Sequence, residues 1–142
     1  MRKILIIIIL LIQNQLVFAN NKIRVDLIQI LDGDTVIVKI DDNKFPVRIV
    51  IDSYETSKIN RAYKQAYNDN LTIDEVIKKG DNAKKYLNEL YKKSNKKIYL
   101  DFRGLDMYKR VLGILYFDEL NINEDLKTKN YCNRYKYKEF NK

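Results

Sequence analysis

Alternating apolar and polar residues dominate the first third of the chain and predict β-strands. Three such stretches cover residues 22–31, 35–40 and 45–52. In the first stretch the apolar residues shift from odd to even positions near Ile28, a change of phase that a β-bulge produces. The Asp-Asp-Asn-Lys sequence at 41–44 predicts a tight turn, because Asn and Asp tolerate positive φ. Such a meander, with further strands to follow, predicts a small Greek-key barrel.

Helical spacing of apolar residues replaces this alternation between residues 57 and 95. Thr72 and Glu75 have the spacing of a capping box at the start of a short helix. Gly80 is predicted to end that helix, and Asp81 to cap the next one.

The last third of the chain returns to strands. Residues 98–103 and 108–117 predict two more strands, and residues 121–129 predict a short helix. The chain is therefore expected to be an α+β domain whose helices pack against the barrel.

The N-terminal stretch has the pattern of a secretory signal peptide. Arg2 and Lys3 precede an apolar run of nine residues, 4–12, and small or β-branched residues lead up to Ala19. Cleavage after Ala19 would leave a mature domain of residues 20–142, exported to the periplasm or the medium. An uncleaved anchor is the alternative, but the apolar run is short for a membrane span. After cleavage we expect a monomer without stable membrane association.

The composition of the chain excludes several kinds of active site. There is no histidine, so a His-based triad, a His general base or a His zinc site cannot form. The lone Cys132 cannot supply an intramolecular disulfide or a Cys-type zinc cluster. Proton transfer near neutral pH must therefore come from Glu, Asp, Lys, Tyr or water.

The net charge of +8 indicates a polyanionic partner, either nucleic acid or an anionic surface. The chain is also crowded with Lys, Asn, Ile and Tyr and has only four Gly and one Pro. An AT-rich coding sequence would produce the same bias. Charge alone therefore leaves both interpretations open.

Two polar motifs at the ends of predicted strands carry the candidate chemistry. Asp-Gly-Asp-Thr at 32–35 lies between the first two strands, where Gly33 is expected to permit a sharp turn. Ile-Asp-Ser-Tyr-Glu-Thr at 51–56 follows the third strand, which carries Arg48. Carboxylate oxygens suit Ca²⁺, and the fork of an arginine suits a phosphate.

These motifs resemble those of the staphylococcal-nuclease-like thermonucleases. The turn at 32–35 resembles that family's first metal-binding turn, and residues 51–56 resemble its Ile-Asp-x-Pro-Glu-Thr motif. Tyr-Lys-Arg-Val-Leu at 108–112 is similar to its Tyr-Gly-Arg-x-Leu segment. Asn123-Glu124 followed by Leu126 matches the start of its second conserved helix. The four matches occur in the family's order and cover most of the mature chain.

The resemblance implies a five-stranded OB-fold barrel, Ca²⁺ as the cofactor, and hydrolysis of DNA and RNA that leaves 3′-phosphate ends. It also implies a role for each candidate residue. The implied catalytic residues are Arg48, Glu55 and Arg110; the metal ligands are Asp34, Asp52 and the main-chain carbonyl of Ser53; the substrate-binding residues are Tyr108, Tyr135 and Tyr137. Glu55 would act as general base or position the attacking water. Residues 60–79 would be a helical insertion relative to shorter members of the family.

Three departures from the family pattern concern the site. Tyr54 replaces a proline, and Lys109 replaces a common glycine. Arg48 stands four residues before Asp52 rather than five. Because strand side chains alternate in direction, an even separation places both on one side of a regular strand. We therefore expect a regular strand over 47–51, with Arg48 directed toward the phosphate. The alternative is an Arg48 that points into solvent or to the far side of the barrel.

Two functions outside enzyme catalysis remain open from the sequence. A catalytically weak or inactive OB-fold module could bind nucleic acid at the same face. A surface-adhesion domain could be held by its basic charge. Taken singly, most of the charged residues would be solvated surface residues, and Arg110 could pair with Asp106. The conjunction of motifs favours the nuclease.

Overall fold

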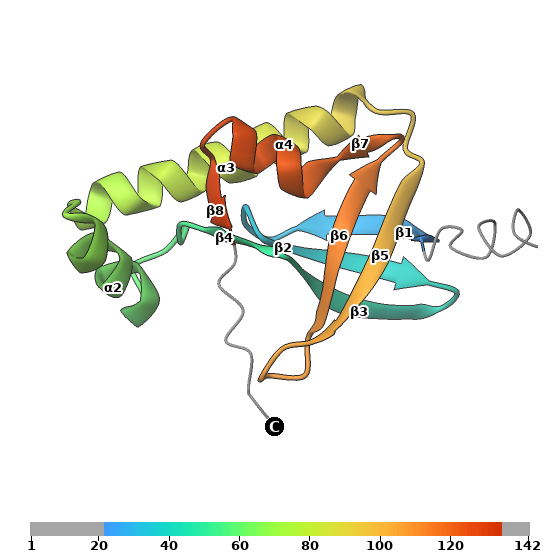
Figure 1. Ribbon diagram of the computed structural model, residues 1–142, viewed down its shortest axis with the longest axis horizontal. Helices are drawn as coiled ribbons and strands as arrows, with labels where there is room; N and C mark the ends of the chain where they lie inside the picture. The colour runs from blue at the N-terminus through green and yellow to red at the C-terminus, as the bar shows by residue number, and fades with distance from the viewer. Residues whose placement is uncertain (1–21, 135–142) are drawn as a thin grey trace, which may run out of the picture.

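A closed five-stranded barrel forms the centre of the molecule (Figure 1). The structure is a computed structural model and describes residues 22–134. The barrel strands are β1 (Lys22–Ile30), β2 (Thr35–Ile40), β3 (Asn43–Ile49), β5 (Ile98–Leu105) and β6 (Val111–Phe117). Their order is β3-β2-β1-β5-β6, and a parallel pairing of β3 with β6 closes the barrel. The fold is α+β and OB-like, as the sequence predicted.

Three helices and three short strands complete the described part of the chain. The helices are α2 (Asn60–Asp69), α3 (Ile73–Lys93) and α4 (Ile122–Thr128). The short strands are β4 (Ile51–Ser53), β7 (Leu120–Asn121) and β8 (Cys132–Arg134). Figure 1 shows α3 and α4 together on one side of the barrel, with α2 beside the far end of α3. Within residues 22–134, no helix has the length and apolar character that a membrane span requires.

The core lies inside the barrel and under α3 and α4. Alternate residues of the strands point inward, and Leu87 of α3 and Leu126 of α4 cover them. The pairing of β1 with β2 shifts register between Leu27 and Gln29, which confirms the bulge predicted near Ile28. The bulge moves the apolar face of β1 from odd to even positions, so that Ile30 is buried.

Helix α3 is one continuous helix, and the prediction that Gly80 ends it was wrong. The capping box of Thr72 and Glu75 is confirmed, but the helix continues for 21 residues to Lys93. Gly80 is buried in the middle, where a Cβ atom would lie 2.7 Å from the carbonyl oxygen of Tyr54. Glycine is therefore present because the backbone of another segment packs against the helix, and not because the helix stops.

The third strand is interrupted, which corrects the prediction of a regular strand over 47–51. Strand β3 ends at Ile49, the chain bends at Val50, and β4 begins at Ile51. The bend lets the chain leave the barrel, because β4 pairs with β8 and not with a barrel strand. Arg48 and Asp52 nevertheless lie on the same side, with Arg48 Nη2 3.2 Å from Asp52 Oδ1. That part of the prediction is confirmed.

Other elements also differ from the predictions. Strand β6 starts at Val111 rather than Tyr108, because residues 106–109 form a turn. Lys109 adopts a φ of 60°, the left-handed region that favours glycine, which explains why a glycine would suit this position. Strands β7 and β8 were not predicted at all. The predicted signal peptide 1–19, and Tyr135 and Tyr137, lie outside the described residues.

Candidate functional site

The turn between β1 and β2 buries Asp34 at the end of the barrel. Asp34 is 1% exposed, and its main-chain N–H donates to Asp32 Oδ1 at 2.9 Å. Its carboxylate accepts hydrogen bonds from the Thr35 hydroxyl and from the Ser53 main-chain N–H, both at 2.9 Å. Asp34 thus ties β2 to β4, which carries the second acidic motif.

Gly33 is needed in this turn because of close packing, not because of a left-handed backbone. A Cβ atom on Gly33 would overlap the Ser53 hydroxyl and lie 2.7 Å from Cβ of Ala83 on α3. Gly104 is the glycine that has a positive φ among the described residues. The turn therefore fits between β4 and α3, which fixes the position of Asp34.

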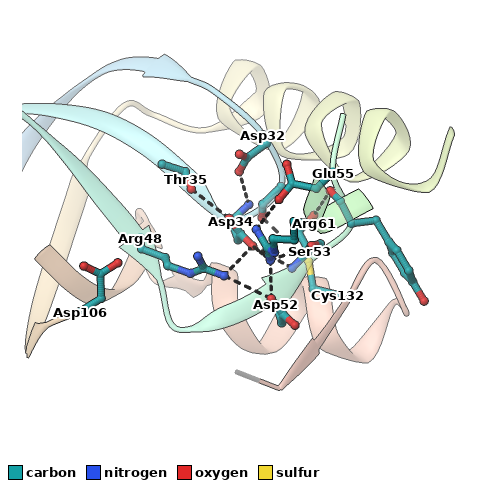
Figure 2. A network of polar contacts seen from close by, with 12 residues as sticks. Asp32, Asp34, Thr35, Arg48, Asp52, Ser53, Glu55, Arg61, Asp106 and Cys132 are labelled. Atoms are coloured by element: carbon teal, nitrogen blue, oxygen red, sulfur yellow. Dashed lines mark hydrogen bonds and ion pairs between the residues drawn. The ribbon is translucent and has the colours of Figure 1, made fainter. Parts of the chain in front are cut away.

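Oxygen atoms of four residues surround the guanidinium of Arg61 (Figure 2). Arg61 Nη2 lies 3.3 Å from Asp34 Oδ2, 2.5 Å from Asp52 Oδ1 and 3.2 Å from the Ser53 carbonyl oxygen. Arg61 Nη1 donates to Glu55 Oε1 at 2.5 Å. The three residues expected to hold a metal and the expected general base therefore lie around one cationic group.

Arg48 approaches the same carboxylates from the barrel side. Its Nη2 lies 3.4 Å from Asp34 Oδ2 and 3.2 Å from Asp52 Oδ1, and the residue is 7% exposed. The alternative that Arg48 points into solvent or to the far side of the barrel is therefore wrong. Strand β3 positions it, since Arg48 pairs with Thr35 of β2 and Leu112 of β6.

Helix α2 holds the loop that carries Glu55 by hydrogen bonds. Gln65, one helical turn after Arg61, accepts a hydrogen bond from the Glu55 main-chain N–H at 3.0 Å. The Gln65 amide also donates to the Ser53 carbonyl at 2.9 Å. Neither Arg61 nor Gln65 was predicted from the sequence as part of the site. The available signal was two long polar residues at i and i+4 on the helix directly after the acidic motif.

The carboxylates shift the pKa values of their neighbours. Burial, and then the charge of Asp34, raise the pKa of Asp32 to about 6. Burial alone would lower the pKa of Arg61, but the charges of Asp34, Glu55 and Asp52 outweigh it and raise that pKa. Burial and the charge of Asp34 also raise the pKa of the Cys132 thiol to about 12. The site is therefore a partly buried cluster of negative charge in which Arg61 stays protonated.

Helix α3 supports the Glu55 loop through Gly80. A Cβ atom on Gly80 would overlap the carbonyl oxygen of Glu55 and lie 2.7 Å from the carbonyl oxygen of Tyr54. We expect Gly80→Ala to lower the free energy of unfolding by about 1–3 kcal/mol, because the backbone must move apart. This expected loss is the net change. The higher helix propensity of alanine, worth about 1 kcal/mol, works against the strain and is already included.

Urea denaturation of Gly80→Ala and of Asn82→Ala provides the comparison. Asn82 is exposed on the same helix. Its replacement should leave stability unchanged or raise it by a few tenths of a kcal/mol, since alanine is the better helix former. Equal stability of the two variants would show that the close approach at Gly80 is not what supports the loop.

Tyr108 and Arg110 are the two remaining candidates within the described residues. They lie in and beside the turn before β6. Arg110 Nε donates to Asp106 Oδ2 at 2.6 Å, and its guanidinium lies 5.4 Å from the centre of the Tyr108 ring. Val111 pairs with Val47, so Arg110 lies near the middle of β3 rather than beyond its end, where Asp52 is found. The structure does not bring Arg110 into hydrogen-bonding contact with the carboxylates around Arg61. Tyr108 is 71% exposed.

In comparisons with known proteins, no family model and no curated protein matches this chain.

The oxygen atoms around Arg61 fit a hard cation in their chemistry. Within residues 22–134, no three Asp, Glu or Cys side chains form a group arranged to hold a metal ion. Two carboxylates and one main-chain carbonyl, from Asp34, Asp52 and Ser53, do converge on Arg61 Nη2. Oxygen ligands of this kind suit Ca²⁺, which takes its remaining ligands from water or substrate. The residues therefore fit Ca²⁺, provided that the Arg61 guanidinium moves away.

Proposed function

We propose that the protein is an exported, Ca²⁺-dependent, sugar-nonspecific endonuclease that hydrolyses DNA and RNA. The observation that carries this proposal is the convergence of Asp34, Asp52 and the Ser53 carbonyl on one cationic position, with Glu55 beside it. These oxygen atoms come from two motifs that resemble those of the thermonucleases. A closed OB-like barrel, the fold that the resemblance implies, positions them.

Each group of residues would have its own role in phosphodiester hydrolysis. A Ca²⁺ held by Asp34, Asp52 and the Ser53 carbonyl would supply Lewis-acid stabilisation of the charge on a phosphate oxygen. Glu55 is 9% exposed and held at its main chain by Gln65, and its carboxylate would accept the proton of an attacking water once the Arg61 guanidinium has moved away. Arg48, beside Asp52, would donate its fork to the phosphate.

The substrate would lie across the barrel end beside these residues. Arg110 would join the phosphate only by leaving its ion pair with Asp106. Tyr108, which is exposed, would stack on bases, because aromatic rings stack with little sequence preference. Tyr135 and Tyr137, which alternate with basic residues in the sequence, would do the same. We propose 3′-phosphate products on the strength of the resemblance.

Plasmid cleavage by the purified mature chain tests the requirement for the cation. We expect relaxed and linear products with Ca²⁺ and intact supercoiled plasmid in chelator. Zn²⁺ should not restore cleavage to the chelated protein, because the site offers oxygen ligands and no His or Cys set. Full cleavage in chelator would contradict the Ca²⁺ mechanism.

A non-catalytic nucleic-acid-binding module is the second candidate. One observation favours it: Arg61 already contacts the four oxygen atoms on which catalysis would depend. A protein of this kind would bind a labelled single-stranded oligonucleotide in a fluorescence anisotropy titration and leave it uncut after prolonged incubation with Ca²⁺. Cleavage of the oligonucleotide decides for the enzyme.

A further inference from the structure

Arg61 occupies the position that a divalent cation would need. Its Nη2 lies within 3.3 Å of Asp34 Oδ2, Asp52 Oδ1 and the Ser53 carbonyl oxygen. These three oxygen atoms are the proposed ligands of the cation, and a cation bound to them would overlap the guanidinium nitrogen. The Ser53 carbonyl also accepts from Gln65, so both of its lone pairs are in use. Cation and guanidinium cannot occupy this place together.

The charge of the cluster makes the competition energetically strong. Three carboxylates, Asp34, Asp52 and Glu55, face the two guanidinium groups of Arg48 and Arg61. Removal of the Arg61 charge would leave the carboxylates with Arg48 as their nearest cation among the described residues. A divalent cation would then meet a more negative site, and it would no longer have to displace the ion pairs of Arg61.

The helix that carries Arg61 has a weak start. Ile59 occupies the N-cap position of α2 without a side-chain cap, and the first turn contains no acidic residue. Arg61 itself places a positive charge in that first turn, where the helix dipole disfavours it. The carboxylates therefore hold Arg61 in place, and its side chain, 33% exposed, has a path to solvent.

We infer that Arg61 is an internal counter-cation of the site and that a divalent cation binds only by displacing its guanidinium. This inference rests on the proposed function, because it takes the same oxygen atoms as the cation ligands. Arg61 thereby sets the Ca²⁺ concentration at which the site fills. Arg61 lies in the helical segment, residues 60–79, that the resemblance does not cover.

Calorimetric titration of the metal-free chain with CaCl₂ tests the inference without any substrate. Arg61→Ala removes the guanidinium, and Arg61→Gln removes the charge but keeps a polar side chain should the alanine variant fold poorly. Lys64→Ala is the matched control, because Lys64 is an exposed cation on the same helix. We expect both Arg61 variants to bind Ca²⁺ at least about tenfold more tightly than wild type. The control should stay within about twofold of wild type.

Thermal unfolding gives an independent readout of the same competition. Ca²⁺ should raise the melting temperature of Arg61→Ala more than that of wild type, because ligand binding stabilises in proportion to the logarithm of ligand concentration over Kd. Equal or weaker Ca²⁺ binding by both Arg61 variants would overturn the inference, as would a failure of every variant to bind.

The nuclease assay separates this inference from the proposed function. Cleavage of plasmid by wild type with Ca²⁺, together with unchanged Ca²⁺ affinity in the Arg61 variants, overturns the inference and leaves the nuclease in place. Tighter Ca²⁺ binding by the Arg61 variants, with no cleavage by any of them or by wild type, supports the counter-cation and contradicts the nuclease.

Discussion

Replacement of Asp34 by alanine is expected to lower the free energy of unfolding by about 3–5 kcal/mol, the range seen when one partner of a buried ion pair is removed. The Asp34 carboxylate accepts from the Ser53 N–H and the Thr35 hydroxyl and pairs with Arg48 and Arg61. Asp34 is 1% exposed, so water cannot easily replace these contacts. Two donors and one nearly buried guanidinium would lose their shared acceptor.

Urea denaturation measures this loss, with Asp42→Ala as the control. Asp42 forms a 3.6 Å ion pair with Lys39, but its side chain is fully exposed. Exposed pairs contribute about 0–1 kcal/mol, so the control should remain close to wild type. A loss below about 1 kcal/mol for Asp34→Ala would show that the buried network does not hold the two motifs together.

Replacement of Glu55 by glutamine is expected to lower turnover by roughly a hundredfold or more, while nucleic-acid binding stays nearly unchanged. Glutamine has the size of Glu55 but cannot accept the proton of an attacking water. The main-chain hydrogen bond from Glu55 to Gln65 does not depend on the side chain, so the loop should keep its position. Single-turnover cleavage of a labelled oligonucleotide, with anisotropy for binding, separates the two effects.

Glu119→Gln is the matched control for this experiment, because Glu119 is exposed and undergoes the same chemical change. The melting temperature of both variants shows whether they fold. If Glu55→Gln folds and turns over as fast as Glu119→Gln, Glu55 is not the base, and its contact with Arg61 is structural.

The barrel could be predicted because its signals are local. Alternation of apolar residues marks the strands, and the change of phase near Ile28 marks the bulge that the structure contains. The role of Gly80 could not be predicted in this way. Its neighbours are the carbonyl groups of Tyr54 and Glu55, which are distant in sequence. The same is true of β8, whose partner β4 lies about eighty residues earlier.

The carboxylates of the site could also be predicted, because Asp34, Asp52 and Glu55 belong to two recognisable motifs. The position of Arg61 could not be predicted, because only the packing of α2 against the loop that carries Glu55 brings Arg61 to these carboxylates. Arg110 shows the converse. Its motif suggested a catalytic arginine, but a neighbour four residues away, Asp106, holds it by a hydrogen-bonded ion pair.

The central claim is that Asp34, Asp52 and Glu55 belong to a Ca²⁺-dependent phosphodiesterase site. Cleavage of an end-labelled oligonucleotide under single-turnover conditions tests this claim most directly. With excess enzyme and Ca²⁺, we expect shorter products whose 3′ ends block polymerase extension until a phosphatase is added. Chelator should abolish the reaction. An oligonucleotide that stays intact with saturating Ca²⁺, or is cut equally fast in chelator, would contradict the account.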